Sequence, residues 1–385
     1  MELKELFSPG KIGNVQIKNR IIRSATTERL ANKDGTINDK YIKNYTDLAE
    51  GGIGLIISGF INIELGYSVM PNSPALYNDS FISGQKKLVD AVHDYSDVKF
   101  AAQLAHTGRQ TSHPKFEAVG PSPIPDKSVN RVPRELTDDE IKEIIKKFVN
   151  AGRRAYEIGY DMVQLHAAHG YLLSNFISPY SNKRTGEYGG DTKRRTKILV
   201  DIYNQLREEV GKNLPIIIKL QTEDGVPEGM TLEEGKKIAR IVIDTGYNAI
   251  EVSGGMGESL IGTKNALPSK QNIGPEEENY FLQSIKEIRP YMKDCAAILV
   301  GGVKNPITVE KFLQDKIIDF ISMCRPLIRE PDLPNRWKNG DISPAHCISC
   351  NSCYMSALTG PIYCTVKENL KKKRLRKEQR LKKNK

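Results

Sequence analysis

Residues 162–171, Met162-Val-Gln-Leu-His166-Ala-Ala-His169-Gly-Tyr171, combine a short apolar run with two histidines and a tyrosine. The run that ends at His166 is typical of a buried strand in a parallel sheet, since it is short and almost wholly apolar. Polar side chains follow where the strand ends. In barrels of alternating strands and helices, functional residues lie at the C-terminal ends of the strands. This segment therefore predicts a βα unit with a functional edge.

The same alternation of strand and helix patterns extends over most of the chain. Strands are predicted at 20–24, 53–59, 99–104, 162–166, 215–219, 249–253, 297–300 and 320–323. Helices are predicted at 38–51, 80–95, 137–159, 192–212, 231–246, 276–290 and 306–315, with an eighth after Glu330. Eight strands with interleaved helices indicate an α/β fold, specifically a (β/α)8 TIM barrel. An open doubly wound sheet is the alternative, but the sequence has no GxGxxG phosphate loop.

Composition excludes several classes of protein. The 385 residues suffice for one barrel with appendages, and 39% hydrophobic and 27% charged residues are ordinary for a soluble protein. No apolar run approaches the roughly 18 residues that cross a bilayer. The N-terminus also lacks the apolar core of a signal peptide. We therefore expect a cytoplasmic protein without a membrane span.

The net charge of +10 is concentrated at one end of the chain. Residues 367–385 contain eleven Lys/Arg and two Glu, a net charge of +9, which leaves about +1 for the rest. A nearly neutral body argues against a nucleic-acid-binding protein. We expect a solvated basic tail, and contact with nucleic acid or an anionic surface is the less favoured interpretation.

Four of the six cysteines lie within eighteen residues near the C-terminus: Cys347, Cys350, Cys353 and Cys364. In a chain without a secretion signal, such clustering indicates metal or cluster ligation rather than disulfides. The spacing suits a [4Fe–4S] cluster; structural zinc and no metal at all are the alternatives. The predicted organisation is a barrel over 1–345, a cysteine-rich segment over 346–366 and a basic tail over 367–385.

The two histidines and the tyrosine of the opening segment suit carbonyl chemistry. Imidazoles of His166 and His169 can donate hydrogen bonds to a carbonyl oxygen on which charge develops. The phenol of Tyr171 is protonated at neutral pH and can deliver a proton. Taken alone, the histidine pair suits a structural role equally well. A zinc protease site is not favoured, because HExxH is absent.

Several motifs resemble the Old Yellow Enzyme family of flavin oxidoreductases, in particular the branch of bacterial 2,4-dienoyl-CoA reductase. The resemblance covers nearly the whole barrel and is carried by residues 6–20, 101–109, 166–179 and 324–332. It implies an enzyme that binds FMN, accepts electrons from NAD(P)H and reduces activated carbon–carbon double bonds of small-molecule substrates.

The resemblance also implies roles for individual residues. Tyr171 is the expected proton donor, His166 and His169 hold the substrate carbonyl, and Thr27 tunes the flavin near its reactive edge. The remaining positions are expected to bind the cofactor. Ser24, Ala25, Thr26 and Thr27 lie against the flavin ring, with Gly59 close to it, Gln103 on the pyrimidine part, Lys219 as a nearby cation, and Gly301, Gly302, Cys324 and Arg325 around the phosphate.

Three departures from the family pattern qualify these expectations. The third cysteine of the cluster usually stands one residue further along in the relatives. Those relatives continue into FAD- and NAD(P)H-binding domains, whereas this chain stops about twenty residues after Cys364, so we expect any cluster to need a separate electron-donor protein. The loop at 252–258 lacks the additional catalytic histidine of the long relatives. An amine-type flavin dehydrogenase and an FMN-binding electron-transfer subunit are therefore alternative functions. A homo-oligomer is compatible with the sequence.

Overall fold

Eight parallel strands close into a barrel in the computed structural model, which describes residues 2–95, 97–261 and 266–383. In spatial order they are β3 (Ile21–Arg23), β4 (Leu55–Ile57), β6 (Lys99–Ala105), β9 (Met162–Ala167), β10 (Ile216–Gln221), β11 (Ala249–Ser253), β12 (Ala296–Leu299) and β13 (Phe320–Met323). The barrel closes because β3 pairs with both β4 and β13, and β4 pairs with β6. All eight predicted strands and the predicted TIM barrel are confirmed.

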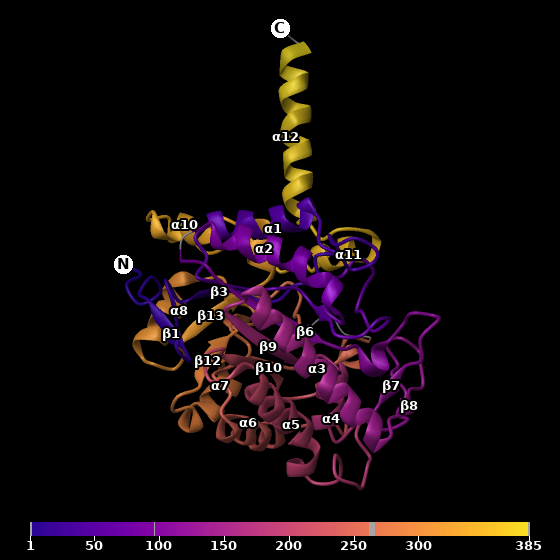
Figure 1. The fold of residues 1–385 in the computed structure, drawn as a ribbon. Helices are drawn as coiled ribbons and strands as arrows, with labels where there is room; N and C mark the ends of the chain where they lie inside the picture. The colour runs from indigo at the N-terminus through magenta and orange to yellow at the C-terminus, as the bar shows by residue number, and fades with distance from the viewer. Residues whose placement is uncertain (1, 96, 262–265, 384–385) are drawn as a thin grey trace.

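Helices surround the barrel on its outside (Figure 1). They are α1 (Asp39–Glu50), α2 (Ile82–His93), α3 (Asp138–Ile158), α5 (Thr192–Val210), α6 (Leu232–Thr245), α7 (Leu282–Ile288), α8 (Pro306–Gln314) and α10 (Leu333–Lys338). Thr137 caps α3 in a capping box with Glu140, and Thr231 accepts from the Glu234 amide at the start of α6. The first part of the predicted helix 276–290 is wrong. A 3-10 turn occupies Pro275–Glu277, and α7 begins only at Leu282.

A hairpin that was not predicted from the sequence covers the N-terminal end of the barrel. It consists of β1 (Gly10–Ile12) and β2 (Val15–Ile17), and the buried Ile12 and Ile17 pack among the apolar side chains of the barrel interior. Gly13, at φ +56°, lies against Asn248 and Pro215, which directly precede β11 and β10. Because this end is plugged, the open end of the barrel lies at the C-terminal ends of the strands.

Shorter elements in the loops complete the architecture. They are β5 (Ile61–Asn62), β7 (Val119–Gly120), β8 (Arg134–Glu135), α4 (Leu172–Ile177) and α9 (Arg325–Arg329). α4 follows directly on Tyr171, and α9 follows β13. Both lie in loops at the open end of the barrel, where the predicted functional residues are found.

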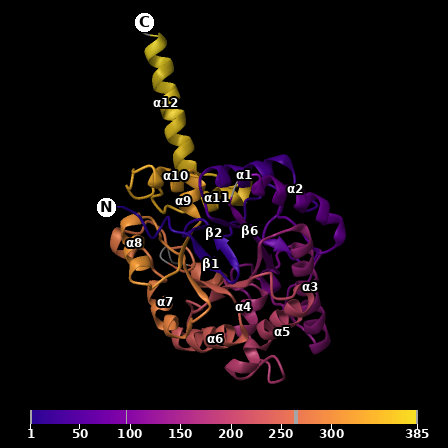
Figure 2. The same ribbon diagram turned by 60° about the vertical axis from the view of Figure 1, so that its left-hand side comes forward.

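The C-terminal segment packs on the barrel before it leaves the body of the molecule. The Asn272 amide donates to the Ser349 carbonyl at 2.9 Å, and the Ile362 amide donates to the Glu28 carbonyl at 3.0 Å. α11 (Ser352–Thr359) lies within this segment, and α12 (Thr365–Lys383) then projects as a free-standing helix (Figures 1 and 2). In the described part of the chain, no helix is both long and apolar enough to cross a bilayer.

Candidate active site

A cavity opens at the C-terminal ends of the strands, where the barrel architecture places functional residues. Its empty volume is about 730 Å3, including the part open to solvent. Eight of the residues predicted from the sequence line it together: Ser24, Ala25, His169, Lys219, Gly301, Gly302, Cys324 and Arg325. Residues far apart in the sequence are thus brought to one site.

A buried polar network centred on Glu251 adjoins this cavity, because its members Ser24, Lys219 and Ser322 line the cavity. The Glu251 carboxylate lies 2.8 Å from Lys219 Nζ and accepts hydrogen bonds from Ser24 Oγ at 2.7 Å and Ser322 Oγ at 2.9 Å. Gln164 Nε2 donates to its second oxygen at 2.9 Å. Burial would raise the pKa of Glu251, but the Lys219 ammonium and these hydrogen bonds outweigh it and lower the pKa. Glu251 is therefore ionised, although the sequence did not single it out.

The remaining predicted cofactor residues lie beside this network. Gln103 Nε2 donates to Gln164 Oε1 at 2.7 Å, so it belongs to the same buried layer. Thr26 Oγ1 donates to Cys324 Sγ at 3.1 Å and links the loops after β3 and β13. A Cβ added at Gly59 would lie 2.3 Å from the Thr26 carbonyl oxygen, so only glycine fits there. Thr27 is half-buried next to Thr26.

The two histidines and the tyrosine form an aromatic cluster at the end of β9. The ring centroids of His166 and His169, and those of His166 and Tyr171, are 5.0 Å apart in edge-to-face arrangement. Phe60 lies against the Tyr171 ring at 5.3 Å. His169 adopts φ +68°, and its Nε2 lies 2.8 Å from Ser253 Oγ, which fixes the ring.

Electrostatics set the protonation states of this cluster. Burial, together with the positive charge of Lys219, lowers the pKa of His166 well below its ordinary value and that of His169 to about 3. Burial also raises the pKa of Tyr171. At neutral pH the cluster therefore offers two neutral imidazoles and a protonated phenol.

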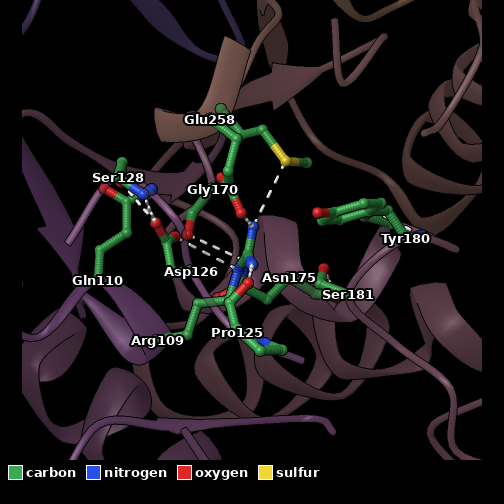
Figure 3. A network of polar contacts seen from close by, with 12 residues as sticks. Arg109, Gln110, Pro125, Asp126, Ser128, Gly170, Asn175, Tyr180, Ser181 and Glu258 are labelled. Carbon is green, nitrogen blue, oxygen red and sulfur yellow. Dashed lines mark hydrogen bonds and ion pairs between the residues drawn. The ribbon is translucent and has the colours of Figure 1, made fainter. Parts of the chain in front are cut away.

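A second buried network is centred on Arg109 (Figure 3). Arg109 follows β6 and is fully buried; its guanidinium lies 2.7 Å from Glu258 and 3.6 Å from Asp126. The neighbouring Gln110 Nε2 donates to the His169 carbonyl at 2.7 Å. Glu258 comes from the loop after β11, which lacks the family histidine. Burial and the nearby Asp126 raise the pKa of Glu258 against the opposing charge of Arg109. Arg109, Asp126 and Glu258 were assigned no role from the sequence.

The four clustered cysteines line a second, smaller cavity, whose empty volume is about 310 Å3 including the part open to solvent. Arg325 lines both cavities, so the two are neighbours. Arg329 Nη1 lies 4.0 Å from Cys364 Sγ. Among residues 2–95, 97–261 and 266–383, no three His, Cys, Asp or Glu side chains are arranged to hold a metal ion. The four thiols thus face one space without converging on a single point.

Comparison with known proteins adds independent information. A model of the NADH:flavin oxidoreductase / NADH oxidase family matches residues 5–342. An NADH oxidase of Thermoanaerobacter brockii is 36% identical over 353 residues, which cover 90% of this chain and 52% of that protein. An NADPH dehydrogenase of Geobacillus sp. (strain WCH70) is 31% identical over 330 residues, which cover 86% of this chain and 92% of that protein. The chain spans about half the length of the first relative and nearly all of the second.

A solved structure extends the comparison. A complex of 2-naphthoyl-CoA reductase with 2-naphthoyl-CoA superposes with a TM-score of 0.86 at 27% identity. The match covers 94% of this chain and 56% of that one.

Proposed function

The chain belongs to the NADH:flavin oxidoreductase / NADH oxidase family, whose members are FMN-dependent and use NAD(P)H, and we propose that it reduces activated carbon–carbon double bonds. The substrate class is small molecules with a double bond conjugated to a carbonyl group. The observation that carries this proposal is that one cavity is lined both by cations and by His169, whose ring belongs to an aromatic cluster with the neutral imidazole of His166 and the protonated phenol of Tyr171.

The cationic end of the cavity fits the phosphate of FMN. Three cations, Lys219, Lys304 and Arg325, line the cavity, and none of its described lining residues carries a carboxylate. Lys219 and Lys304 are paired with Glu251 and Glu278. Arg325 donates to the Lys270 carbonyl at 2.8 Å and to Asn351 Oδ1 at 2.6 Å, and no acidic partner of it lies among the described residues. Its uncompensated charge therefore favours an anionic ligand.

Two glycines beside Arg325 support the same assignment. Gly301 and Gly302 follow β12 with φ +96° and +75°, a conformation that other residues rarely adopt. A Cβ at Gly301 would lie 2.6 Å from the Tyr280 ring. The loop after strand seven of a barrel is a common phosphate site. We assign Gly301, Gly302, Cys324 and Arg325 to the phosphate.

The flavin ring would lie across the polar network toward the histidines. Ser24, Ala25, Thr26 and Thr27 would face it, with Gly59 and Gln103 at its edges. The chemistry supplied by bound FMN is transfer of a hydride from NAD(P)H to the β-carbon of the substrate double bond. Lys219 would favour negative charge on the reduced ring, moderated by its pairing with Glu251.

The aromatic cluster would orient and protonate the substrate. A neutral imidazole keeps one N–H, so His166 and His169 can each donate to the carbonyl oxygen and stabilise charge that develops there. Ser253 holds the His169 ring in position through its contact with Nε2. Tyr171 is protonated and would deliver a proton to the α-carbon.

The cysteine-lined cavity fits an iron–sulfur cluster better than zinc. Zinc requires all four sulfurs about 2.3 Å from one point, whereas the ligands of a [4Fe–4S] cluster are spread around a cage. Four thiols that line one cavity without converging on a single point correspond better to the second arrangement. Cys347, Cys350, Cys353 and Cys364 would be the ligands. Iron and acid-labile sulfide in the anaerobically purified protein would support the cluster, and bound zinc without iron would contradict it.

The activity is tested by anaerobic turnover of the FMN-loaded protein with NADH or NADPH and 2-cyclohexenone. We expect cyclohexanone in amounts equal to the nucleotide oxidised. Oxidation of the nucleotide with oxygen as the acceptor, without any reduction of a panel of enones, would contradict the assignment. Oxidation of an amine with reduction of the flavin would instead favour the dehydrogenase alternative.

A further inference from the structure

Exposed apolar side chains are concentrated on the cysteine-rich segment. Within 346–366, five large apolar side chains are half or more exposed: Ile348, Tyr354, Met355, Leu358 and Tyr363. Such a concentration marks an interaction site more often than a solvated surface. The segment borders the cavity of the four cysteines, because Ile348 is one of its lining residues. We call these five side chains the apolar patch.

The basic helix α12 adjoins the apolar patch. α11, which carries three of the patch residues, contacts α12. α12 begins at Thr365, directly after Cys364, and Figures 1 and 2 both show it projecting from the body on the side of α11. Residues 367–382 carry nine Lys/Arg and two Glu, whereas the chain before residue 367 is nearly neutral. One face of the molecule therefore combines an apolar surface with a strongly positive arm.

The charge pattern of α12 disfavours a helix that stands alone. Lys372 and Arg376, and likewise Lys373 and Lys377, are four residues apart and repel each other along the helix. Arg374 and Glu378 form a compensating ion pair at 3.0 Å. Most of the stability of a helix in a protein comes from tertiary packing, and α12 projects from the body. A negatively charged partner would remove the repulsion and stabilise the helix.

The side chains of α12 favour a protein partner over nucleic acid or a membrane. α12 contains no aromatic residue that could stack on bases. Its exposed Leu370, Leu375 and Leu381 are five and six residues apart, so they do not form the single apolar stripe of a membrane-surface helix. An apolar centre with a charged rim is the usual composition of a protein–protein interface.

We propose that the apolar patch and α12 together dock an acidic electron-transfer protein beside the four cysteines. This inference rests on the proposed function, since the docked protein would act as an electron donor in place of NAD(P)H. Two molecules of the reduced donor would lose one electron each. These two electrons, with one proton from water, are equivalent to the hydride that NAD(P)H supplies. The cysteine cavity borders the patch through Ile348 and borders the cavity assigned to FMN through Arg325.

The test uses the FMN-loaded full chain and a [2Fe–2S] ferredoxin of net negative charge. Binding is measured by calorimetry at low and high salt, and ferredoxin-driven flavin reduction is measured by anaerobic stopped-flow. We expect at least tenfold weaker binding for a variant with Lys372, Lys373, Arg376 and Lys377 changed to Gln. Salt should weaken wild-type binding strongly and that of the variant little, because the attraction is electrostatic. Met355→Ser with Leu358→Ser should also weaken binding, without a change in its salt dependence.

A matched control distinguishes binding at this site from a general attraction to the positive charge of the protein. Changing Lys142, Lys146, Lys193 and Lys237 to Gln removes four exposed charges from α3, α5 and α6, and binding should stay as in wild type. Equal loss in this control would overturn the proposal. The proposal would also be overturned if the wild-type protein bound duplex DNA or phosphatidylserine vesicles through α12 and did not bind ferredoxin. NADH-driven enone reduction, measured in parallel, should be unchanged in every variant. If NADH-driven enone reduction were absent while ferredoxin still bound, the proposed function would be contradicted but the docking site would not.

Discussion

Lys219 and Glu251 face each other on neighbouring strands, with 2.8 Å between Lys219 Nζ and the Glu251 carboxylate. Both side chains are buried, and Lys219 lines the cavity that we assign to FMN. The positive charge of Lys219 is therefore largely compensated before any cofactor binds. The charge of Lys219 lowers the pKa of Glu251 and keeps that carboxylate ionised, and a buried pair is costly to break from one side. Under the proposed function, this pairing would moderate the stabilisation that Lys219 gives to a reduced flavin.

Removing the negative partner should make the flavin easier to reduce. Glu251→Gln keeps acceptors for Ser24 and Ser322 but leaves the Lys219 charge uncompensated, so we expect the midpoint potential to rise by tens of millivolts. For a two-electron couple, about 30 mV corresponds to about 1.4 kcal/mol. Lys219→Met should lower the potential by a similar amount. Both shifts are measurable by anaerobic spectroelectrochemistry. Equal potentials in all three proteins would show that the pair does not lie against the ring.

Tyr171→Phe should separate the two half-reactions. The variant loses the proton donor but keeps the aromatic contacts with His166 and Phe60. We expect reoxidation of reduced flavin by an enone to slow by about 10²–10⁴-fold, and reduction by NADH to stay within about twofold. Stopped-flow absorbance measures both rates. Tyr156→Phe, at an exposed position of α3, is the control and should change neither. Equal losses in both half-reactions would argue against the role of Tyr171.

Glu28 predicts a pH dependence of stability. Its side chain is buried beneath the loop after β3, and Tyr45 Oη donates to Oε1 at 3.0 Å. Oε2 has no hydrogen-bond partner among the described residues. Burial, only partly offset by Arg23, raises the pKa from 4.5 to about 7. The native state therefore keeps a proton that the unfolded state releases near pH 4.5.

The sign of the effect follows from proton linkage. The native state binds more protons than the unfolded state between the two pKa values, so the free energy of unfolding falls as pH rises from about 4.5 to about 7. The loss through this group amounts to about 3 kcal/mol at most. Glu28→Gln should flatten the profile measured by urea unfolding across this range. Glu143→Gln, on the exposed face of α3, should keep the wild-type slope. An unchanged slope in Glu28→Gln would refute the elevated pKa.

Arg109 should be essential for the stability of the open end of the barrel. Arg109→Met leaves the carboxylates of Asp126 and Glu258 buried without their cation, and we expect a loss of about 3–5 kcal/mol. Adding Glu258→Gln to that variant should recover part of the loss, because one buried charge is removed. A double-mutant cycle on thermal unfolding measures the coupling. Additive effects of the two changes would mean that the 2.7 Å contact contributes nothing specific.

The barrel strands could be predicted because each is a short apolar run. The residues at the C-terminal ends of the strands could be predicted because they directly follow those runs. Glu251 left a weaker signal. It is a single acid inside the strand Ala249–Ser253, and the alternation of side chains places it on the same face as Ala249 and Ser253. Its pairing with Lys219 depends on the register of two strands, which no local pattern specifies.

Other features depended on contacts between distant segments. Arg109 and Glu258 are 149 positions apart in the sequence, and their pairing arises only when the loops after β6 and β11 meet. The hairpin β1–β2 has a local signal in its alternation around Gly13, but its place as a plug beneath β10 and β11 is tertiary. The apolar patch shows in the sequence merely as ordinary apolar residues, since exposure is a property of the fold.

The most direct test of the account is an anaerobic absorbance spectrum of the purified protein, supplied with FMN and desalted, before and after addition of NADH or NADPH. We predict one tightly bound FMN per chain, with flavin bands that the nucleotide bleaches, and much weaker retention of FMN in Arg325→Gln. A folded protein that retains no FMN after it has been supplied would contradict the assignment of the cavity, and with it the proposed function.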